Sequence, residues 1–221
     1  MPMENLTRDD FTLSANTPNV NTTVAEYVMP RGYAKRFLAQ NARLMLGTMD
    51  QFAGTGAQTV FNLTRDIIPS RGNGPATTDG AVATVNGAAV AISSIDYNAN
   101  TVTLAVAPAN GATVKIYYPF SEGRYTVEVF SADERRHDTH ANGSIRRLNA
   151  SNQEDVNQIF RLDFPTNWLP QDFLLRIQVN TPATVNWDAA NPFSIIQFPF
   201  ERRDIRSFRP EELVAAYQAL G

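Results

Sequence analysis

The sequence contains no cysteine and almost no lysine. Among its 221 residues, the absence of cysteine excludes disulfide scaffolds, cysteine nucleophiles and thiolate metal sites. Of the 19 basic residues only Lys35 and Lys115 are lysines, and the others are arginines. Arginine suits planar, bidentate contacts and ion pairs at interfaces, although the base composition of a GC-rich genome produces the same bias.

Long apolar runs and a large excess of one charge are missing as well. No stretch reaches the ~18 apolar residues of a transmembrane helix, and the formal net charge is -3. We therefore expect neither a membrane nor a nucleic acid as partner. The first ten residues contain Glu4, Asp9 and Asp10 and no apolar segment, so no signal peptide is expected. With 43% hydrophobic and 19% charged residues, the chain is apolar enough to fold around a core.

The motifs of common enzyme classes are also absent. The sequence has no Gly-x-Ser-x-Gly elbow, no phosphate-binding glycine loop with lysine and no His-Glu-x-x-His. Its acidic pairs are adjacent in sequence, so they do not predict two facing carboxylates. His137 and His140 flank Asp138 and could share a metal in a helix, but their surroundings are typical of a solvated loop. We predict no catalytic residue, no metal and no cofactor.

Apolar and polar residues alternate at strand spacing through most of the chain, which predicts an all-β protein. Asn86-Gly87 is a strong hairpin signal, because both central residues of a type I′ turn need a positive φ. A helix is expected from Arg209 to Gly221, either as a lid on the sandwich or as a docking element for a partner. Strands are expected around Tyr27 and Phe37 and over 59–63, 81–85, 90–95, 101–106, 113–118, 125–130, 144–148, 159–164, 172–179 and 193–200, with a polar connection at 132–143.

Changes in composition near residues 51 and 120 predict the domain organisation. The segment 51–119 is rich in Ala, Val, Thr, Asn and Gly, whereas the flanking strands carry more arginine and aromatic residues. We predict an antiparallel, jelly-roll-like β-sandwich formed by 24–50 and 120–206, with a small antiparallel sandwich of 51–119 inserted in it. Residues 1–23 are expected to form an extended arm, or a frayed end, and 207–221 the short C-terminal helix. Domains in series are the alternative.

The middle segment carries a pattern of short strands and turns that resembles a known group of domains. Its parts are QTVFNL (58–63), ATVNG (83–87), IDYN (95–98), TVTL (101–104) and APANGATVKIYY (107–118). These resemble the small Ig-like β-domains of structural proteins of tailed bacteriophages and related viruses. The resemblance is confined to this middle segment, and the long loop at 71–80 departs from it.

The resemblance implies a virion structural protein, most simply a capsid decoration, cement or minor capsid protein. Its partners would be the major capsid protein or other virion proteins and further copies of itself, in an oligomer that matches the capsid symmetry. A tail or baseplate component is one alternative. A carbohydrate-binding or adhesin module is another, for which Trp168 and Trp187 would be sugar platforms rather than residues that cover the ends of the sandwich.

Three groups of residues are the predicted partner contacts. The arm would be anchored on a neighbouring chain by its apolar side chains. The polar loop at 132–143 and the mixed-charge segment 201–209 would supply arginines for contacts with carboxylates across a subunit boundary. These residues are Phe11, Leu13, Val20, Arg135, Arg136, Arg202, Arg203 and Arg206.

Overall fold

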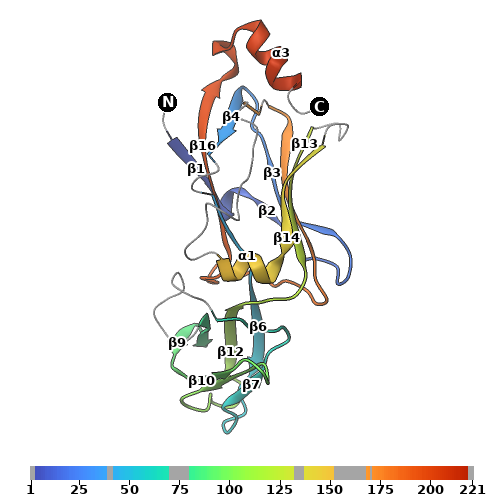
Figure 1. Ribbon diagram of the computed structural model, residues 1–221. Helices are drawn as coiled ribbons and strands as arrows, with labels where there is room; N and C mark the ends of the chain where they lie inside the picture. Colours follow the sequence, from blue (N-terminus) through green and yellow to red (C-terminus); the bar gives the residue numbers. More distant parts are fainter. Residues whose placement is uncertain are drawn as a thin grey trace.

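The computed structural model describes residues 3–38, 42–69, 80–131, 137–151, 168–169 and 171–218. Two β-sandwiches, which we call the main sandwich and the small sandwich, are stacked end to end along the long axis of the molecule (Figure 1). The predicted fold class, an all-β antiparallel sandwich with a short C-terminal helix, is confirmed. No helix of the described ranges is long and apolar enough to cross a membrane.

The main sandwich consists of two antiparallel sheets. The first has the order β1-β16-β4, and β5 also pairs with β16; the second has the order β14-β13-β15-β3-β2. The strands of the first sheet are β1 (Met3–Thr7), β16 (Ile195–Asp204), β4 (Tyr33–Phe37) and β5 (Arg43–Met45). Those of the second are β14 (His137–Ser144), β13 (Arg124–Ser131), β15 (Phe173–Asn180), β3 (Thr22–Val28) and β2 (Thr12–Leu13).

Strict alternation fixes the register of the central strands. Along β15, Phe173, Leu175, Ile177 and Val179 are buried, and the residues between them are partly exposed. Ile177 pairs with Val127 of β13 on one side and with Ala25 of β3 on the other. A shift by one residue would move this whole apolar row to the solvent side, so the burial pattern specifies a single register.

The small sandwich is built from the strands between Gly47 and Pro119, and within the described ranges these strands pair only with one another. One sheet has the order β6-β12-β8-β9, with β6 (Gly47–Ala53), β12 (Thr113–Pro119), β8 (Val82–Val85) and β9 (Ala88–Val90). The other has the order β10-β11-β7, with β10 (Ile92–Asp96), β11 (Thr101–Leu104) and β7 (Val60–Asn62). Whether this unit is Ig-like stays a prediction.

The turns of the small sandwich follow the sequence closely. Asn86 and Gly87 have φ values of 50° and 84°, as a type I′ turn between β8 and β9 requires. The predicted return strand 90–95 is divided, however. The chain leaves the first sheet after Val90 and continues as β10 in the second sheet, so the predicted strand contributes to both layers.

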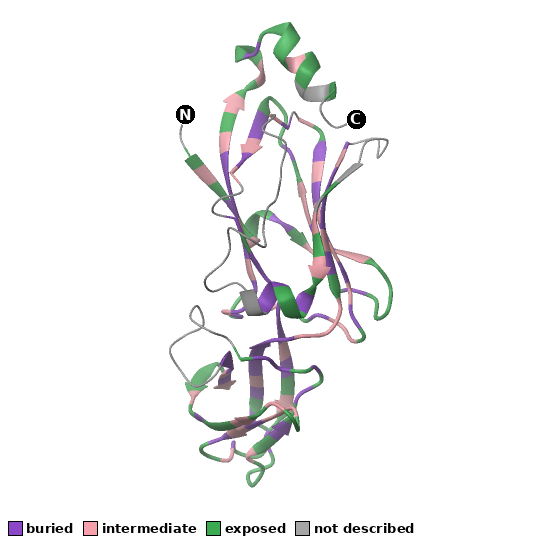
Figure 2. Cartoon of the chain, in the orientation of Figure 1, coloured by how far each residue is buried: buried purple, intermediate pink, exposed green. Residues whose placement is uncertain are grey.

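Buried apolar residues form one continuous cluster through both sandwiches (Figure 2). It contains Phe61, Leu104 and Val114 of the small sandwich together with Val127 and Phe198 of the main sandwich. A second, smaller cluster of Met45, Tyr117 and Phe193 lies where the sandwiches meet. The two sandwiches are therefore packed against each other.

The prediction of an arm that leaves the subunit is wrong for residues 3–13. Strand β1 pairs with β16 from Met3↔Glu201 to Thr7↔Gln197, and β2 pairs with β3. The short 3-10 helix η1 (Arg8–Asp10) joins them. The segment has no regular apolar period because it contributes single buried residues, Leu6 and Phe11, rather than a face. Residues 3–13 are ordered because they pair with β16 and β3, and not because their own composition favours a strand.

Two other predicted elements differ from the structure. Residues 137–144 are strand β14 at the edge of a sheet, where polar residues are tolerated, instead of a loop. The segment expected as a strand at 144–148 is the start of helix α1 (Ile145–Ser151). Its buried positions, Ile145, Leu148 and Asn149, have the i, i+3, i+4 spacing of a helix, and the Ser144 hydroxyl accepts a hydrogen bond from the Arg147 amide.

The last described element is helix α3 (Pro210–Gln218), which follows β16 and the 3-10 helix η4 (Ile205–Ser207). The predicted boundary near residue 51 also shifts, because β6 begins at Gly47 and pairs with β12 as far as Gly47↔Pro119. The predicted strand 159–164 and residues 71–79 of the predicted loop 71–80 lie outside the described residues.

The buried position of Phe11 gives a direct test of the N-terminal segment. Its side chain is 7% exposed, and its ring centroid lies 5.8 Å from that of Tyr27 and 6.0 Å from that of Phe198. We expect Phe11→Ala to lower the free energy of unfolding of the isolated chain by about 3–5 kcal/mol, measured by urea denaturation. Val20→Ala, at a 51% exposed position, is the control and should change it by less than about 0.5 kcal/mol. Equal stabilities would restore the arm interpretation.

Candidate functional site

The side-chain amide of Asn149 joins the two sandwiches. The chain enters the small sandwich after Leu46 and leaves it at Phe120. From helix α1, the Asn149 Oδ1 accepts a hydrogen bond from Leu46 N at 3.0 Å, and its Nδ2 donates to Leu46 O at 2.9 Å and to Phe120 O at 2.8 Å. Asn149 is 1% exposed. One buried side chain therefore satisfies backbone groups at both crossings.

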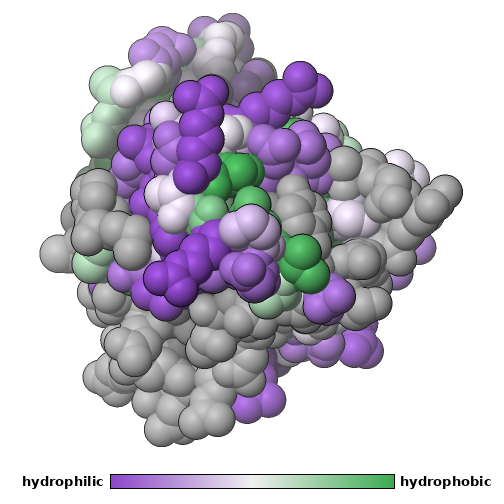
Figure 3. All heavy atoms as spheres, turned by 90° about the horizontal axis from the view of Figure 1, so that it is seen from above, coloured by the Kyte–Doolittle hydropathy of each residue, from purple (hydrophilic) through white to green (hydrophobic). Residues whose placement is uncertain are grey.

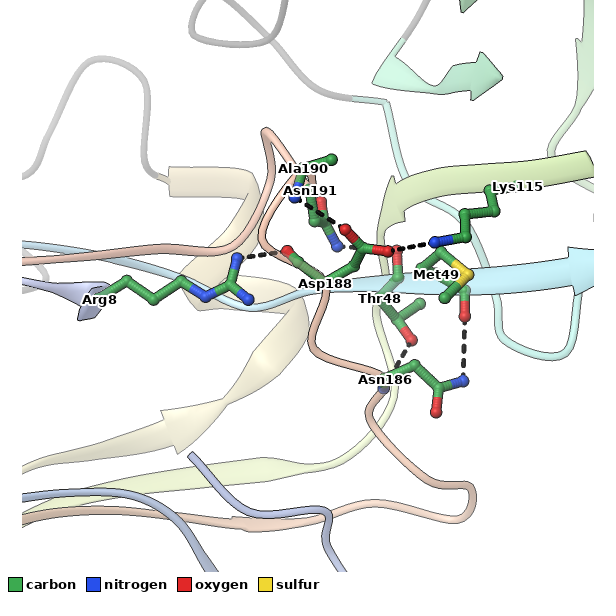
Figure 4. Close-up of polar contacts among 8 residues, drawn as sticks. All are labelled: Arg8, Thr48, Met49, Lys115, Asn186, Asp188, Ala190 and Asn191. Atoms are coloured by element: carbon green, nitrogen blue, oxygen red, sulfur yellow. Dashed lines mark hydrogen bonds and ion pairs between the residues drawn. The ribbon is translucent and has the colours of Figure 1, made fainter. Parts of the chain in front are cut away.

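The loop 181–194 of the main sandwich lies against the first residues of β6 (Figure 4). Asn186 donates from its Nδ2 to Met49 O at 3.0 Å, and Asn191 donates from its Nδ2 to Thr48 O at 3.0 Å. The approach is so close that a Cβ at Gly47 would lie 2.6 Å from the carbonyl carbon of Phe193. Only glycine fits at this position.

Asp188 in the same loop connects three parts of the chain (Figure 4). Its Oδ2 lies 2.8 Å from Lys115 Nζ on β12, and its backbone oxygen accepts a hydrogen bond from the Arg8 guanidinium in η1. The hydrogen bond from Lys115 lowers the pKa of Asp188, so the ion pair is fully formed at neutral pH. The N-terminal segment, the small sandwich and the loop thus meet at one residue.

A buried cation, Arg65, extends from the small sandwich into the main sandwich. Arg65 is fully buried, donates from Nε to Thr184 O at 3.2 Å and from Nη2 to Thr181 Oγ1 at 3.3 Å, and lies 4.4 Å above the Phe120 ring. Burial lowers the pKa of Arg65. Beside it, Asp50 accepts a hydrogen bond from the Tyr118 hydroxyl at 2.6 Å, and burial raises the pKa of that hydroxyl.

These junction contacts are suited to holding two domains together. The Asn149 and Arg65 side chains are buried and bond to groups across the junction, although the Arg65 Nη1 has no hydrogen-bond partner. No group of three or more potential metal ligands is found in the described ranges. His137 and His140 belong to a strand, so the helical spacing that suggested a shared metal does not apply.

One further buried charge lies between the sheets of the main sandwich. Lys35 on β4 is 4% exposed, with its Nζ 4.5 Å from the Tyr27 ring centroid and 4.0 Å from that of Phe200. It donates a hydrogen bond to the Tyr27 hydroxyl. Burial lowers the pKa of Lys35 to about 8 and raises the pKa of Tyr27 to about 12. This pair links β4 to β3 across the interior.

The predicted arm anchors are distributed differently from expectation. Phe11 is a core residue, Leu13 is half-buried against the same core, and Val20 is exposed. Phe11 is therefore not available to a neighbouring chain, because the subunit's own aromatic residues surround it.

The predicted interface arginines make contacts within the chain. Arg202 pairs with Glu4 at 3.2 Å and Arg203 with Glu212 at 3.3 Å, whereas Arg206 is exposed. Arg202 and Arg203, which were expected to form ion pairs between subunits, therefore form ion pairs between neighbouring segments of one subunit. Arg135 and Arg136 lie outside the described residues.

The two tryptophans also contact residues of their own chain. Trp168 lies edge-on to Phe208 with ring centroids 5.5 Å apart and under the Arg36 guanidinium at 5.2 Å. Trp187 packs against the main core, with the Arg8 guanidinium 5.8 Å from its ring. Both tryptophans therefore fit the interpretation in which they cover the ends of the sandwich, and not the one in which they are sugar platforms.

The junction residues were not among the predicted site residues. Asn149 follows Leu148 in a segment whose pattern predicts a strand, and its role depends on two crossings, at Leu46 and Phe120, that are far apart in sequence. The sequence contained one indication that Arg65 is important: it is one of the few charged residues in an otherwise nearly uncharged segment. An isolated charge within an apolar stretch is a reason to look for a buried partner.

Comparison with known proteins identifies the fold. No protein family and no curated protein sequence matches the chain. Among solved structures, it resembles a chain of the complex of VP16 and VP17, the two major capsid proteins of bacteriophage P23-77. The TM-score is 0.68 at 20% sequence identity, over 91% of this chain and 99% of that chain. The shared property is the fold.

VP17, a capsid protein of bacteriophage P23-77, gives a second match. Its TM-score is 0.65 at 17% identity, over 91% of this chain and 96% of VP17. Because both matches cover nearly the whole of each chain, the similarity cannot be confined to the main sandwich and includes residues of the small sandwich.

Removal of the Asn149 amide tests the junction. Asn149→Ala leaves three buried backbone groups without this partner, so we expect the free energy of unfolding to fall by about 2–5 kcal/mol. Hydrogen exchange of the Leu46 amide should become faster at the same time. The control is Asn21→Ala, which removes an exposed hydrogen bond with Asn180 and should leave both quantities unchanged. Unchanged exchange at Leu46 in Asn149→Ala would contradict the assigned contact.

Lys35 predicts an unusual pH dependence of stability. Its pKa of about 8 lies below the ordinary value of 10.5, so the folded state loses this proton at a lower pH than the unfolded state does. The free energy of unfolding should therefore rise by about 3 kcal/mol as the pH passes from the folded-state pKa to the unfolded-state pKa, since each pKa unit corresponds to about 1.4 kcal/mol. It should fall at still higher pH, because the raised pKa of Tyr27 keeps that hydroxyl protonated in the folded state only.

Urea denaturation at a series of pH values measures this dependence. Lys35→Met should abolish the rise, whereas Lys115→Met, at the other lysine of the chain, should retain it. A rise that persists in Lys35→Met would show that another group is responsible.

Proposed function

We propose that this protein is a structural component of a viral capsid. The observation that carries the proposal is the extent of the fold similarity, which covers 99% of one phage capsid protein chain and 96% of another. A jelly-roll-like sandwich alone occurs in many proteins and would not justify a function. The similarity includes the second sandwich, and so the two-part architecture as well.

The form of the molecule agrees with a role in assembly. Among the described residues, buried polar contacts hold the small sandwich against the main sandwich. None of these contacts contains a nucleophile beside a base that a substrate could reach. A subunit that must repeat accurately over a closed shell benefits from a fixed shape. We propose that the chain acts through surface contacts in the virion, with other virion proteins and with copies of itself, and without catalysis or a cofactor.

Within this function, a subunit of the shell is favoured over the decoration, cement or minor capsid protein that the sequence suggested. The similar proteins are described as major capsid proteins, and the match leaves little of either chain uncovered. A tail or baseplate component and an adhesin are less well supported. Both tryptophans are engaged by residues of their own chain, so neither is presented as a free platform for sugar.

Graded disassembly of purified particles separates these roles. Particles from the source of this sequence are treated with increasing guanidinium chloride, and each fraction is analysed by quantitative mass spectrometry and electron microscopy. A shell subunit should be among the most abundant proteins and should be released only when the particle collapses. A decoration protein should be released earlier and leave closed shells. Absence of the chain from purified particles would falsify the capsid function itself.

A further inference from the structure

The loop 181–194 bonds to two parts of the chain that are far apart in sequence. One is the N-terminal segment, which we define as residues 3–19, and the other is the small sandwich. Bonds to both parts occur together at three successive places of the loop, at residues 181, 185–186 and 188. The loop is thus held from two directions.

At the first place, the Thr181 hydroxyl joins the two parts through one atom. Its Oγ1 accepts a hydrogen bond from Asn16 Nδ2 at 2.8 Å and another from Arg65 Nη2 at 3.3 Å. The same hydroxyl donates to Ala183 O at 2.6 Å, so both of its lone pairs and its proton are in use. Thr181 is fully buried. A shift of this hydroxyl toward either part would weaken its bond to the other.

At the second place, two neighbouring backbone amides of the loop have partners in different parts. Val185 N donates to Asn16 Oδ1 at 2.6 Å, whereas Asn186 N donates to Thr48 Oγ1 at 3.4 Å. The Asn186 side chain also donates to Met49 O. Asn16 is buried, so its amide satisfies Val185 N where water does not reach it.

At the third place, Asp188 repeats this arrangement (Figure 4). Its backbone oxygen accepts from the Arg8 guanidinium, and its carboxylate accepts from Lys115 Nζ at 2.8 Å. Arg8 and Lys115 approach Asp188 from opposite directions in Figure 4. The N-terminal segment therefore bonds to the loop at three of the places where the loop bonds to the small sandwich.

The loop depends on such bonds because it contains no helix or strand. A segment without a ladder of its own opens more easily than the sheets on either side of it. Among the described residues, the side-chain hydrogen bonds of Arg8 and Asn16 all end on this loop. An effect of these two side chains on the small sandwich must therefore pass through the loop.

We propose that Arg8 and Asn16 are positioning residues for the small sandwich. They hold the loop 181–194 from the N-terminal side, and this keeps its other side in the conformation that binds the small sandwich. Without them the loop changes conformation, and the small sandwich takes a wider range of orientations about the crossings at Leu46 and Phe120 while each sandwich stays folded. The inference does not depend on the proposed capsid function.

Distances between two spin labels on the purified chain test the inference. Because the chain has no cysteine, Val106→Cys on the small sandwich and Val28→Cys at the opposite end of the main sandwich place the labels uniquely. These residues are 77% and 56% exposed. The end that carries Val28 has a mixed surface of hydrophobic and hydrophilic residues and lies away from the junction (Figure 3). Labels at far ends respond to a small rotation about the junction with a large change of distance.

We expect the double variant Arg8→Ala, Asn16→Ala to widen the distribution of label distances measured by pulsed electron paramagnetic resonance. The Asn186 amide should exchange its hydrogen about tenfold faster, because the loop opens more easily when bonds on its N-terminal side are lost. Thr181→Val has nearly the same shape and removes the shared hydroxyl, so it should widen the distribution as well. This variant decides the question if the double variant does not fold.

Phe11→Ala is the matched control, since it alters the same N-terminal segment at a ring that packs on Tyr27 and Phe198 in the core. It should lower the free energy of unfolding without widening the distribution. A merely stabilising role of Arg8 and Asn16 would give the result of this control. Unchanged distributions in the double variant and in Thr181→Val, or an equal widening in Phe11→Ala, would overturn the inference.

Discussion

The chain crosses between two packed sandwiches twice, and the backbone groups at both crossings are buried. Buried amide and carbonyl groups without a partner are costly, so the junction depends on a side chain that can both donate and accept at that position. The Asn149 amide does this by bonding to Leu46 on the way in and to Phe120 on the way out. Its placement requires helix α1, and Gly47 allows the loop at Phe193 to approach from the other side.

The junction contacts fix the position of the small sandwich relative to the main sandwich. One continuous apolar cluster extends through both sandwiches, and Arg65, Lys115 and Asp188 add polar contacts around it. Helix α3 and the small sandwich lie at opposite ends of the molecule (Figure 1).

The abundance of arginine has a structural explanation within the subunit. Arg36 pairs with Glu201 and Arg176 with Glu26 across neighbouring strands, and the planar guanidinium of Arg65 lies against an aromatic ring in the interior. These geometries use properties that lysine lacks. The same contacts explain why two arginines that the sequence suggested as partner-binding residues, Arg202 and Arg203, are already engaged in the folded chain.

Local patterns in the sequence were sufficient for the fold class, for the central strands such as β15, for the turn at Asn86-Gly87 and for the position of α3, because period, turn chemistry and capping act between residues near in sequence. They were insufficient for β1, whose order comes from pairing with β16 near the other end of the chain, and for α1, whose helical face is only seen once the core is known. The junction also depended on the tertiary structure. Asn149, Arg65 and Lys35 are ordinary polar residues in the sequence, and their roles arise from burial beside groups that only folding brings together.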